Sequence, residues 1–137
     1  MGPKDRSVER TMKGLAAFEQ RDADAFMSYA RADYEWRPFL SSTIEGRVYR
    51  GAAGIRQWFA DLEEMFESYS AELAQVRDLG DRVVVLGTVR AQGRGSGVPV
   101  ESELGIVVDL DPAGLARRGV AFPSHAEALT HAGIAAP

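Results

Sequence analysis

Residues Leu79 to Phe122 carry the strongest structural signal in this chain and read LGDRVVVLGTVRAQGRGSGVPVESELGIVVDLDPAGLARRGVAF. Turn-forming residues open it at Gly80-Asp81 and interrupt it at Gly93–Gly97 and Asp111–Gly114. Together with the apolar residues just before it, this pattern predicts four strands, near residues 69–79, 81–93, 98–110 and 115–122. Connections this short cannot make parallel crossovers, so we expect an antiparallel meander.

The predicted strand at residues 98–110 alternates apolar and polar side chains, which is typical of a strand with one face on the core. Its acidic residues Glu101, Glu103 and Asp109 share one face. The opposite face is expected to carry Val98, Val100, Ser102, Leu104, Ile106, Val108 and Leu110. An apolar face of this size needs a covering layer.

Helical patterns before and after the strands supply that layer. One helix is predicted at residues 5–20, a second from Asp22, whose side chain can cap it, and a third over about residues 52–66. The first has an apolar stripe of Val8, Met12, Leu15 and Phe18. Ser124 and Glu127 have capping-box spacing for a short final helix.

The order of these elements predicts one α+β domain over residues 1–137, with no internal repeat and no second-domain boundary. The helices and the sheet can both bury their apolar faces if the helices lie across a curved sheet. Such a packing leaves a cavity between the layers, which is where small molecules bind in folds of this kind.

Composition narrows the classes of function. The chain has 137 residues, no cysteine and a formal net charge of −4. Without cysteine there are no disulfides and no thiolate chemistry, and the mildly acidic balance gives no footprint for nucleic acid. The charged residues 1–14 do not resemble a signal peptide, and no apolar run reaches about 18 residues. We therefore expect a cytoplasmic location and no membrane partner.

Cofactor and metal motifs are also absent from the sequence. His125 and His131 are six residues apart, which places them on different faces of a helix, so they do not form a metal pair. The Gly93–Gly97 segment leads into a strand rather than a helix, so it is not a nucleotide loop. We expect no cofactor and no metal.

Four strings resemble the SnoaL-like branch of the nuclear transport factor 2-like, or ketosteroid isomerase-like, superfamily. They are DYEWRP (residues 33–38), YRGAAGIRQWFADL (49–62), LGDRVVVLGTVRAQGRGSG (79–97) and EALTHAGI (127–134). The resemblance implies a cone-shaped barrel, in which a strongly curved antiparallel sheet packs on three helices beside a short C-terminal helix. It also implies a homodimer through the outer sheet face, with Val84, Leu86, Val120 and Phe122 as apolar candidates.

Members of this superfamily differ in activity, so the fold does not define the function. A ketosteroid isomerase needs a tyrosine, a protonated aspartic acid and a carboxylate base. In the register that the resemblance implies, these positions hold Gly14, Ile106, and Trp36 or Arg37. A limonene-type epoxide hydrolase needs an aspartate–arginine–aspartate set, and the corresponding face here carries Ser102, Leu104 and Ile106. Neither activity is expected in its standard form.

The remaining catalytic candidates lie in the DYEWRP strand. The resemblance implies that Glu35 and Arg37 face the cavity, where Glu35 would act as a base or position water and Arg37 would hold negative charge. A neighbouring arginine lowers the pKa of a carboxyl, which weakens it as a base. In the opposite orientation Tyr34 and Trp36 face the core, and the charged pair is solvated surface.

The predicted cavity walls come from the buried stripes and from the resemblance, and core packing alone would also account for the apolar ones. They are Phe18, Phe26, Tyr29, Trp58, Phe59, Leu62, Met65, Ile106 and Arg117. Three functions stay open. They are a cofactor-free cyclase, isomerase or hydratase for an apolar oxygenated metabolite, a non-catalytic binding domain for a small apolar ligand, and a dimerisation module whose own side chains fill the cavity.

Overall fold

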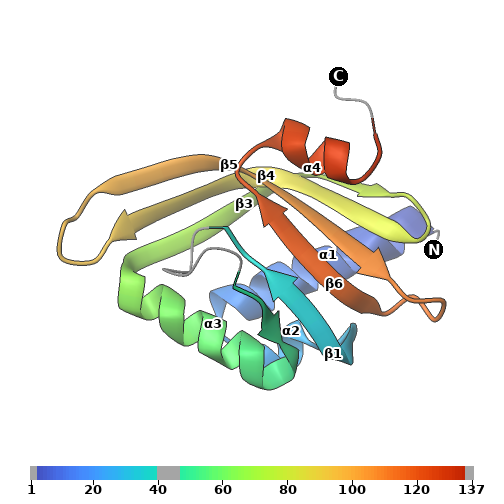
Figure 1. Ribbon diagram of the computed structural model, residues 1–137, viewed down its shortest axis with the longest axis horizontal. Coiled ribbons are helices and arrows are strands. Elements are labelled where there is room, and N and C mark those ends of the chain that lie inside the picture. The colour runs from blue at the N-terminus through green and yellow to red at the C-terminus, as the bar shows by residue number, and fades with distance from the viewer. Residues whose placement is uncertain (1–2, 40–46, 135–137) are drawn as a thin grey trace.

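The computed structural model describes residues 3–39 and 47–134 (Figure 1). Within them the chain forms helices and strands in the order α1 (Pro3–Glu19), α2 (Ala23–Phe26), β1 (Ala30–Arg37), β2 (Tyr49–Arg50), α3 (Gly51–Met65), β3 (Phe66–Asp78), β4 (Arg82–Gly93), β5 (Pro99–Leu110), β6 (Ala116–Phe122) and α4 (His125–His131). The predicted mixed α+β class is confirmed. No helix of the described part is long and apolar enough to cross a membrane.

The described strands form one curved sheet in the order β2-β1-β6-β5-β4-β3. β3 to β6 make the antiparallel meander that the turn residues predict. β1 pairs in parallel with β6, which the long connection through α3 and the meander allows. Because β2 and β3 are edge strands, the sheet is open. The predicted strongly curved sheet is confirmed, and the parallel pairing of β1 with β6 is the departure from the antiparallel sheet that the resemblance implied.

The turn between β5 and β6 shows how local sequence sets the meander. The carboxylate of Asp111 accepts hydrogen bonds from the amides of Ala113 and Leu115, each at 2.9 Å. Gly114 has a φ of 85°, a backbone conformation that glycine adopts without steric penalty. The chain therefore reverses within a few residues and brings β6 back along β5.

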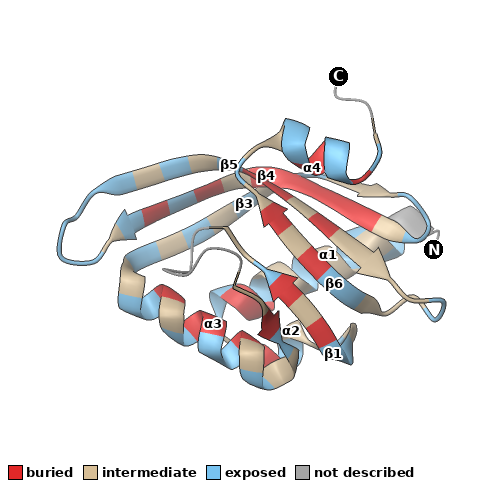
Figure 2. Ribbon diagram, in the orientation of Figure 1, coloured by how far each residue is buried: buried red, intermediate tan, exposed pale blue. Residues whose placement is uncertain are grey.

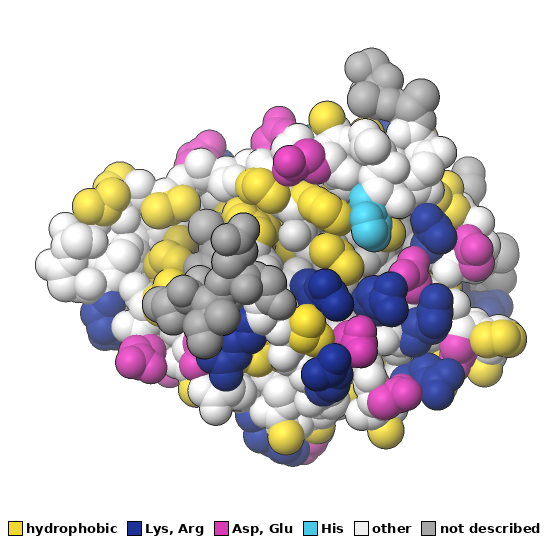
Figure 3. All heavy atoms as spheres, in the orientation of Figure 1, with side chains coloured by type: hydrophobic (Ala, Val, Ile, Leu, Met, Phe, Trp, Pro, Cys, Tyr) yellow, Lys and Arg dark blue, Asp and Glu magenta, His cyan; other side chains and the backbone are white. Residues whose placement is uncertain are grey.

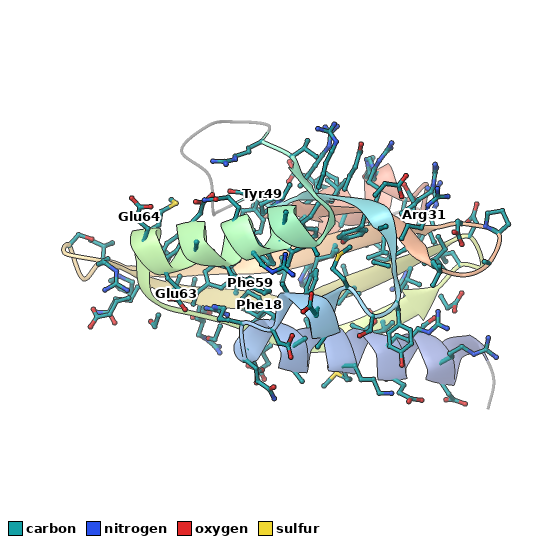
Figure 4. All side chains as sticks on the ribbon, turned by 90° about the horizontal axis from the view of Figure 1, so that it is seen from below. Phe18, Arg31, Tyr49, Phe59, Glu63 and Glu64 are labelled. Atoms are coloured by element: carbon teal, nitrogen blue, oxygen red, sulfur yellow. The ribbon has the colours of Figure 1, made fainter. Side chains whose placement is uncertain are left out.

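The main core lies between the inner sheet face and the helices α1, α2 and α3, where Figure 2 shows buried residues along β4 and on the inner side of α3. Phe18 of α1 stacks on Trp58 of α3 with ring centroids 5.4 Å apart, and meets Phe59 edge-on at 6.1 Å (Figure 4). Such ring pairs add about 0.5–1.5 kcal/mol beyond the area they bury. They fix α1 against α3.

The stripe of α1 that faces the sheet differs from the predicted one. Val8 and Met12 are 44% and 49% exposed, so their assignment to the buried stripe is wrong. The inward side of the helix instead carries polar or small residues in its first half, including Ser7 and Arg10, and Phe18 in its second. Only the second half follows the apolar pattern on which the prediction rested.

Helix α4 covers part of the outer sheet face, opposite the other helices (Figure 1). Its Leu129 packs over Val84 and Leu86, which are 0% and 7% exposed. These two residues are therefore buried within the chain, and their assignment to a dimer interface is wrong. Val120 and Phe122 are half-buried. The homodimer itself stays a prediction.

Candidate functional site

A cavity of about 230 Å³ lies between the inner sheet face and the helices. Its aromatic walls are Phe18, Phe26, Tyr29, Tyr34, Trp36, Phe39, Trp58 and Tyr69. Its aliphatic walls from the sheet are Leu73, Val83, Val85, Leu104, Ile106, Val108 and Leu110. An apolar cavity of about 150 Å³ holds benzene, so this one has room for a molecule of about ten non-hydrogen atoms.

Phenols and an indole are the polar groups that the sheet contributes to the cavity wall, while α1 adds the hydroxyls of Ser7 and Thr11 and the guanidinium of Arg10. Tyr34 is 5% exposed, and its hydroxyl makes no hydrogen bond to another described residue. Burial raises the pKa of Tyr34, and raises the pKa of Tyr69 to about 12. Both hydroxyls are therefore protonated at neutral pH and available as donors. The indole N–H of Trp36 is buried and also lacks a partner among the described residues.

The direction of β1 decides which residues reach the cavity. Tyr34 and Trp36 face inward, each 5% exposed, while Glu35 and Arg37 lie on the opposite face. The prediction that Glu35 and Arg37 face the cavity is wrong. Burial of the two aromatic rings stabilises the folded state, whereas burial of two ionic groups in an apolar space would destabilise it because they would lose their hydration. The orientation with the charged pair at the surface is the one the chain adopts.

Glu35 instead belongs to a row of opposite charges across the outer sheet face, which we call the outer-face ladder. Backbone register places Arg50 opposite Glu35, Glu35 opposite Arg118, Arg118 opposite Asp109, and Asp109 opposite Arg82. Glu35 pairs with Arg50 at 3.4 Å and with Arg118 at 3.6 Å. Figure 3 shows basic side chains with acids between them over β1 and β6. Opposite charges on neighbouring strands stabilise a sheet.

Arg117 is also outside the cavity, because β6 carries a bulge. Val108 of β5 pairs with Gly119, and two residues further along Leu110 pairs with Ala116 instead of Arg117. The extra residue in β6 turns Ala116 toward the cavity and leaves Arg117 exposed. The prediction that Arg117 lines the cavity is therefore wrong by one residue.

The other predicted wall residues divide into two groups. The structure places Phe18, Phe26, Tyr29, Trp58 and Ile106 on the cavity. Phe59 and Leu62 are buried in the core beside it, and Met65 is half-buried; none of these three is among the cavity walls. The apolar stripe of α3 is wider than the cavity, so a buried position there does not by itself give a wall position.

The mouth of the cavity carries the one described charge on its wall. Arg10 of α1 lines the cavity and is half-exposed, which puts it at the rim. Its guanidinium lies 4.6 Å from the centre of the Tyr29 ring and donates to the carbonyl oxygen of Gly114 at 2.9 Å. No described wall residue carries a carboxylate or an imidazole.

Sequence reasoning missed Arg10 and Tyr69 as wall residues. A signal for Arg10 was present, because Ser7, Arg10, Gly14 and Phe18 follow one another at spacings of three and four on one side of α1. Because half of that row is polar, it does not form an apolar stripe and does not indicate a buried helix face. Tyr69 lies in a strand whose inward face the sequence pattern does not define.

Similarity to known proteins agrees with this geometry. The model of the SnoaL-like domain matches residues 10–115, well over half of the chain. No protein with a curated description matches the sequence. A nuclear transport factor 2-like protein from Burkholderia thailandensis is 26% identical with a TM-score of 0.73, over 88% of this chain and 95% of that one.

Other solved structures share the fold at lower identity. TerC, co-crystallised with polyporic acid, is 22% identical with a TM-score of 0.74, over 88% of this chain and 93% of that one. A candidate polyketide cyclase from Xanthomonas campestris is 17% identical with a TM-score of 0.66, over 92% and 96%. The predicted resemblance is confirmed, and the chain belongs to the family of SnoaL-like domains, with a nuclear transport factor 2-like fold.

Proposed function

We propose that the cavity binds a small, largely apolar molecule whose oxygen accepts a hydrogen bond from Tyr34. The observation that carries this proposal is the Tyr34 hydroxyl, which has no hydrogen-bond partner among the described residues and lies on the wall of a largely aromatic and aliphatic cavity. A ligand oxygen would give this hydroxyl an acceptor inside the cavity, and one such hydrogen bond contributes about 0.5–1.5 kcal/mol net. The crystal structure of TerC with polyporic acid supports small-molecule binding in this fold.

A matched pair of probes tests the proposal. 1-Indanone and indane share the same bicyclic body, and the ketone oxygen of 1-indanone is the acceptor. The wild-type protein is expected to bind 1-indanone more tightly than indane, by about three- to tenfold for one net hydrogen bond. In Tyr34→Phe this preference should disappear while indane still binds. Isothermal titration calorimetry measures both affinities.

Tyr49→Phe is the matched control, because Tyr49 is a buried tyrosine outside the cavity whose hydroxyl donates to Asp61 at 2.5 Å. It should keep the preference for 1-indanone. Failure of the wild-type protein to bind either probe would overturn the proposal. An unchanged preference in Tyr34→Phe would overturn the role of Tyr34.

A cofactor-free isomerase, cyclase or hydratase is the second candidate, favoured by the two protonated phenols of Tyr34 and Tyr69 on the cavity wall. A phenol that donates to a carbonyl oxygen stabilises the enolate that forms when a neighbouring C–H loses its proton. The proton also needs a base, which the described wall residues do not supply. Deuterium exchange into 1-indanone beside its carbonyl, followed by NMR in D₂O, separates this candidate from binding alone.

A further inference from the structure

Arg10 has free donor capacity at the rim of the cavity. A guanidinium has five N–H donors, and the carbonyl of Gly114 takes a hydrogen bond from Nη1 alone. The guanidinium carbon also lies 4.6 Å from the centre of the Tyr29 ring, and this cation–π contact is not a hydrogen bond to an oxygen acceptor. The edge of an arginine is the part that matches the two oxygens of a carboxylate.

No described acid neutralises this arginine. Arg10 takes part in none of the ion pairs of the described residues, and acids on adjoining segments have other partners. The Asp78 carboxylate accepts hydrogen bonds from Ser7 and from the amide of Gly80. Asp111 is held by the amides of its own turn and lies 3.8 Å from Arg31. The positive charge at the rim is therefore uncompensated within the described chain.

The surroundings of Arg10 limit the ligand to a single negative charge. The other cation near the Tyr29 ring, Lys13, forms an ion pair with Glu9 at 3.0 Å. Lys13 is not among the cavity walls, so Arg10 is the one described cation that lines the cavity. One guanidinium balances one carboxylate, while a doubly charged phosphate would need a second donor cation here.

We propose that the ligand is a monocarboxylic acid, whose apolar body fills the cavity and whose carboxylate lies at the rim against Arg10. This inference rests on the proposed function and names the class of its ligand. It also assigns Arg10 as the residue that selects an acid over a neutral molecule of the same shape.

Cinnamate and cinnamamide are the probes, because they have the same shape and differ in charge at one end. The wild-type protein is expected to bind cinnamate about tenfold more tightly than cinnamamide at low ionic strength, since a charge-assisted hydrogen bond is about twice as strong as a neutral one. The preference should shrink as salt is added, because Arg10 is half-exposed. Calorimetry at two salt concentrations gives both numbers.

Arg10→Gln should reduce the preference for cinnamate to about onefold, mainly by weakening cinnamate, because the neutral amide lacks the charge that attracts the carboxylate. Arg6→Gln is the matched control, because Arg6 is an exposed arginine one turn earlier on α1 and is not among the cavity walls. It should retain the preference. Arg10→Lys should keep part of it, since a lysine offers the charge without the paired donors.

Two outcomes separate this inference from the proposed function. If cinnamamide binds as tightly as cinnamate, or if Arg10→Gln keeps the full preference, the inference is overturned and the proposed function stands. If neither cinnamate, cinnamamide nor 1-indanone binds, both are overturned.

Discussion

Gly119 of β6 makes room for the polar corner of the cavity. A Cβ at this position would lie 2.9 Å from Cε3 of Trp36 and would collide with the hydroxyl of Tyr34. The bare backbone thus lets both side chains of β1 lie flat against β6, with the Tyr34 hydroxyl beside it. A larger residue would push both rings into the space that we assign to the ligand.

Glu35 is expected to matter for stability and not for binding. Its ion pairs with Arg50 and Arg118 are partly exposed, and such pairs contribute below about 1 kcal/mol each. Glu35→Gln should therefore lower the free energy of unfolding by about 1 kcal/mol or less, and leave the affinity for 1-indanone unchanged. Urea denaturation and calorimetry measure the two quantities.

Glu67→Gln is a suitable comparison, because Glu67 is an exposed acid that forms no ion pair with the described residues. It should alter neither quantity. A loss of 1-indanone binding in Glu35→Gln alone would contradict the outer-face position of Glu35 and restore it as a cavity residue.

Among the elements, α4 and the sheet form a second small core on the face opposite the cavity. Leu129 is 2% exposed and packs on Val84, Leu86 and Val107. The cap of the helix follows the predicted pattern, since the side chain of Ser124 accepts a hydrogen bond from the amide of Glu127. Seven helical residues cannot be stable alone, so α4 depends on this contact.

Leu129→Ala should therefore lower the free energy of unfolding by about 2–4 kcal/mol, the range for a large aliphatic side chain lost from a core. Thr130→Ala, at the exposed neighbouring position, should change it by less than about 0.5 kcal/mol. Chemical denaturation of both variants gives the comparison. A change below about 1 kcal/mol in Leu129→Ala would show that α4 adds little to the fold.

At the scale of the whole molecule, the sheet and three helices keep several phenols away from water. The pKa of Tyr69 rises to about 12 mainly through burial, and the pKa of Tyr34 is raised by burial as well. In the unfolded chain both hydroxyls ionise near pH 10. Their contribution to stability is therefore complete below about pH 10 and is lost as the pH rises toward and through the folded-state pKa.

Alkaline unfolding tests this effect. The free energy of unfolding should fall between pH 10 and pH 12 by up to about 1.4 kcal/mol per pH unit for each buried tyrosine. Tyr69→Phe should reduce this slope, because one ionisable group is removed. Urea denaturation at several pH values measures it. An equal slope in Tyr69→Phe and the wild-type protein would contradict the burial of the Tyr69 hydroxyl.

Much of the fold could be predicted because its signals are local. The turn at Asp111–Gly114 uses its own side chain and backbone, and Asp22 caps α2 by accepting a hydrogen bond from Ala25 at 3.1 Å. Alternation along β5 also places Leu104 and Ile106 on the cavity side, as predicted. Each of these features depends on residues that lie close together in the sequence, within one turn, one helix cap or one strand.

The candidate site was harder to predict, because three of its features depend on distant segments. DYEWRP alternates with a period of two, so it defines two faces, and contact with α3 and β6 selects the aromatic one. A one-residue bulge in β6 places Ala116 instead of Arg117 on the cavity side of the sheet. The cover over Val84 comes from α4, about forty residues later in the chain.

The amino-acid sequence alone determined the elements, the meander and the family, because periodicity, caps and turns are properties of short segments. Tertiary structure decided which polar groups meet in the cavity. Tyr34 lies on β1 and Arg10 on α1. They line the same cavity only because β1 pairs with β6 and α1 crosses the sheet. Burial then acts on whole faces, and it places aromatic rings inside and the ionic pair of Glu35 and Arg118 outside.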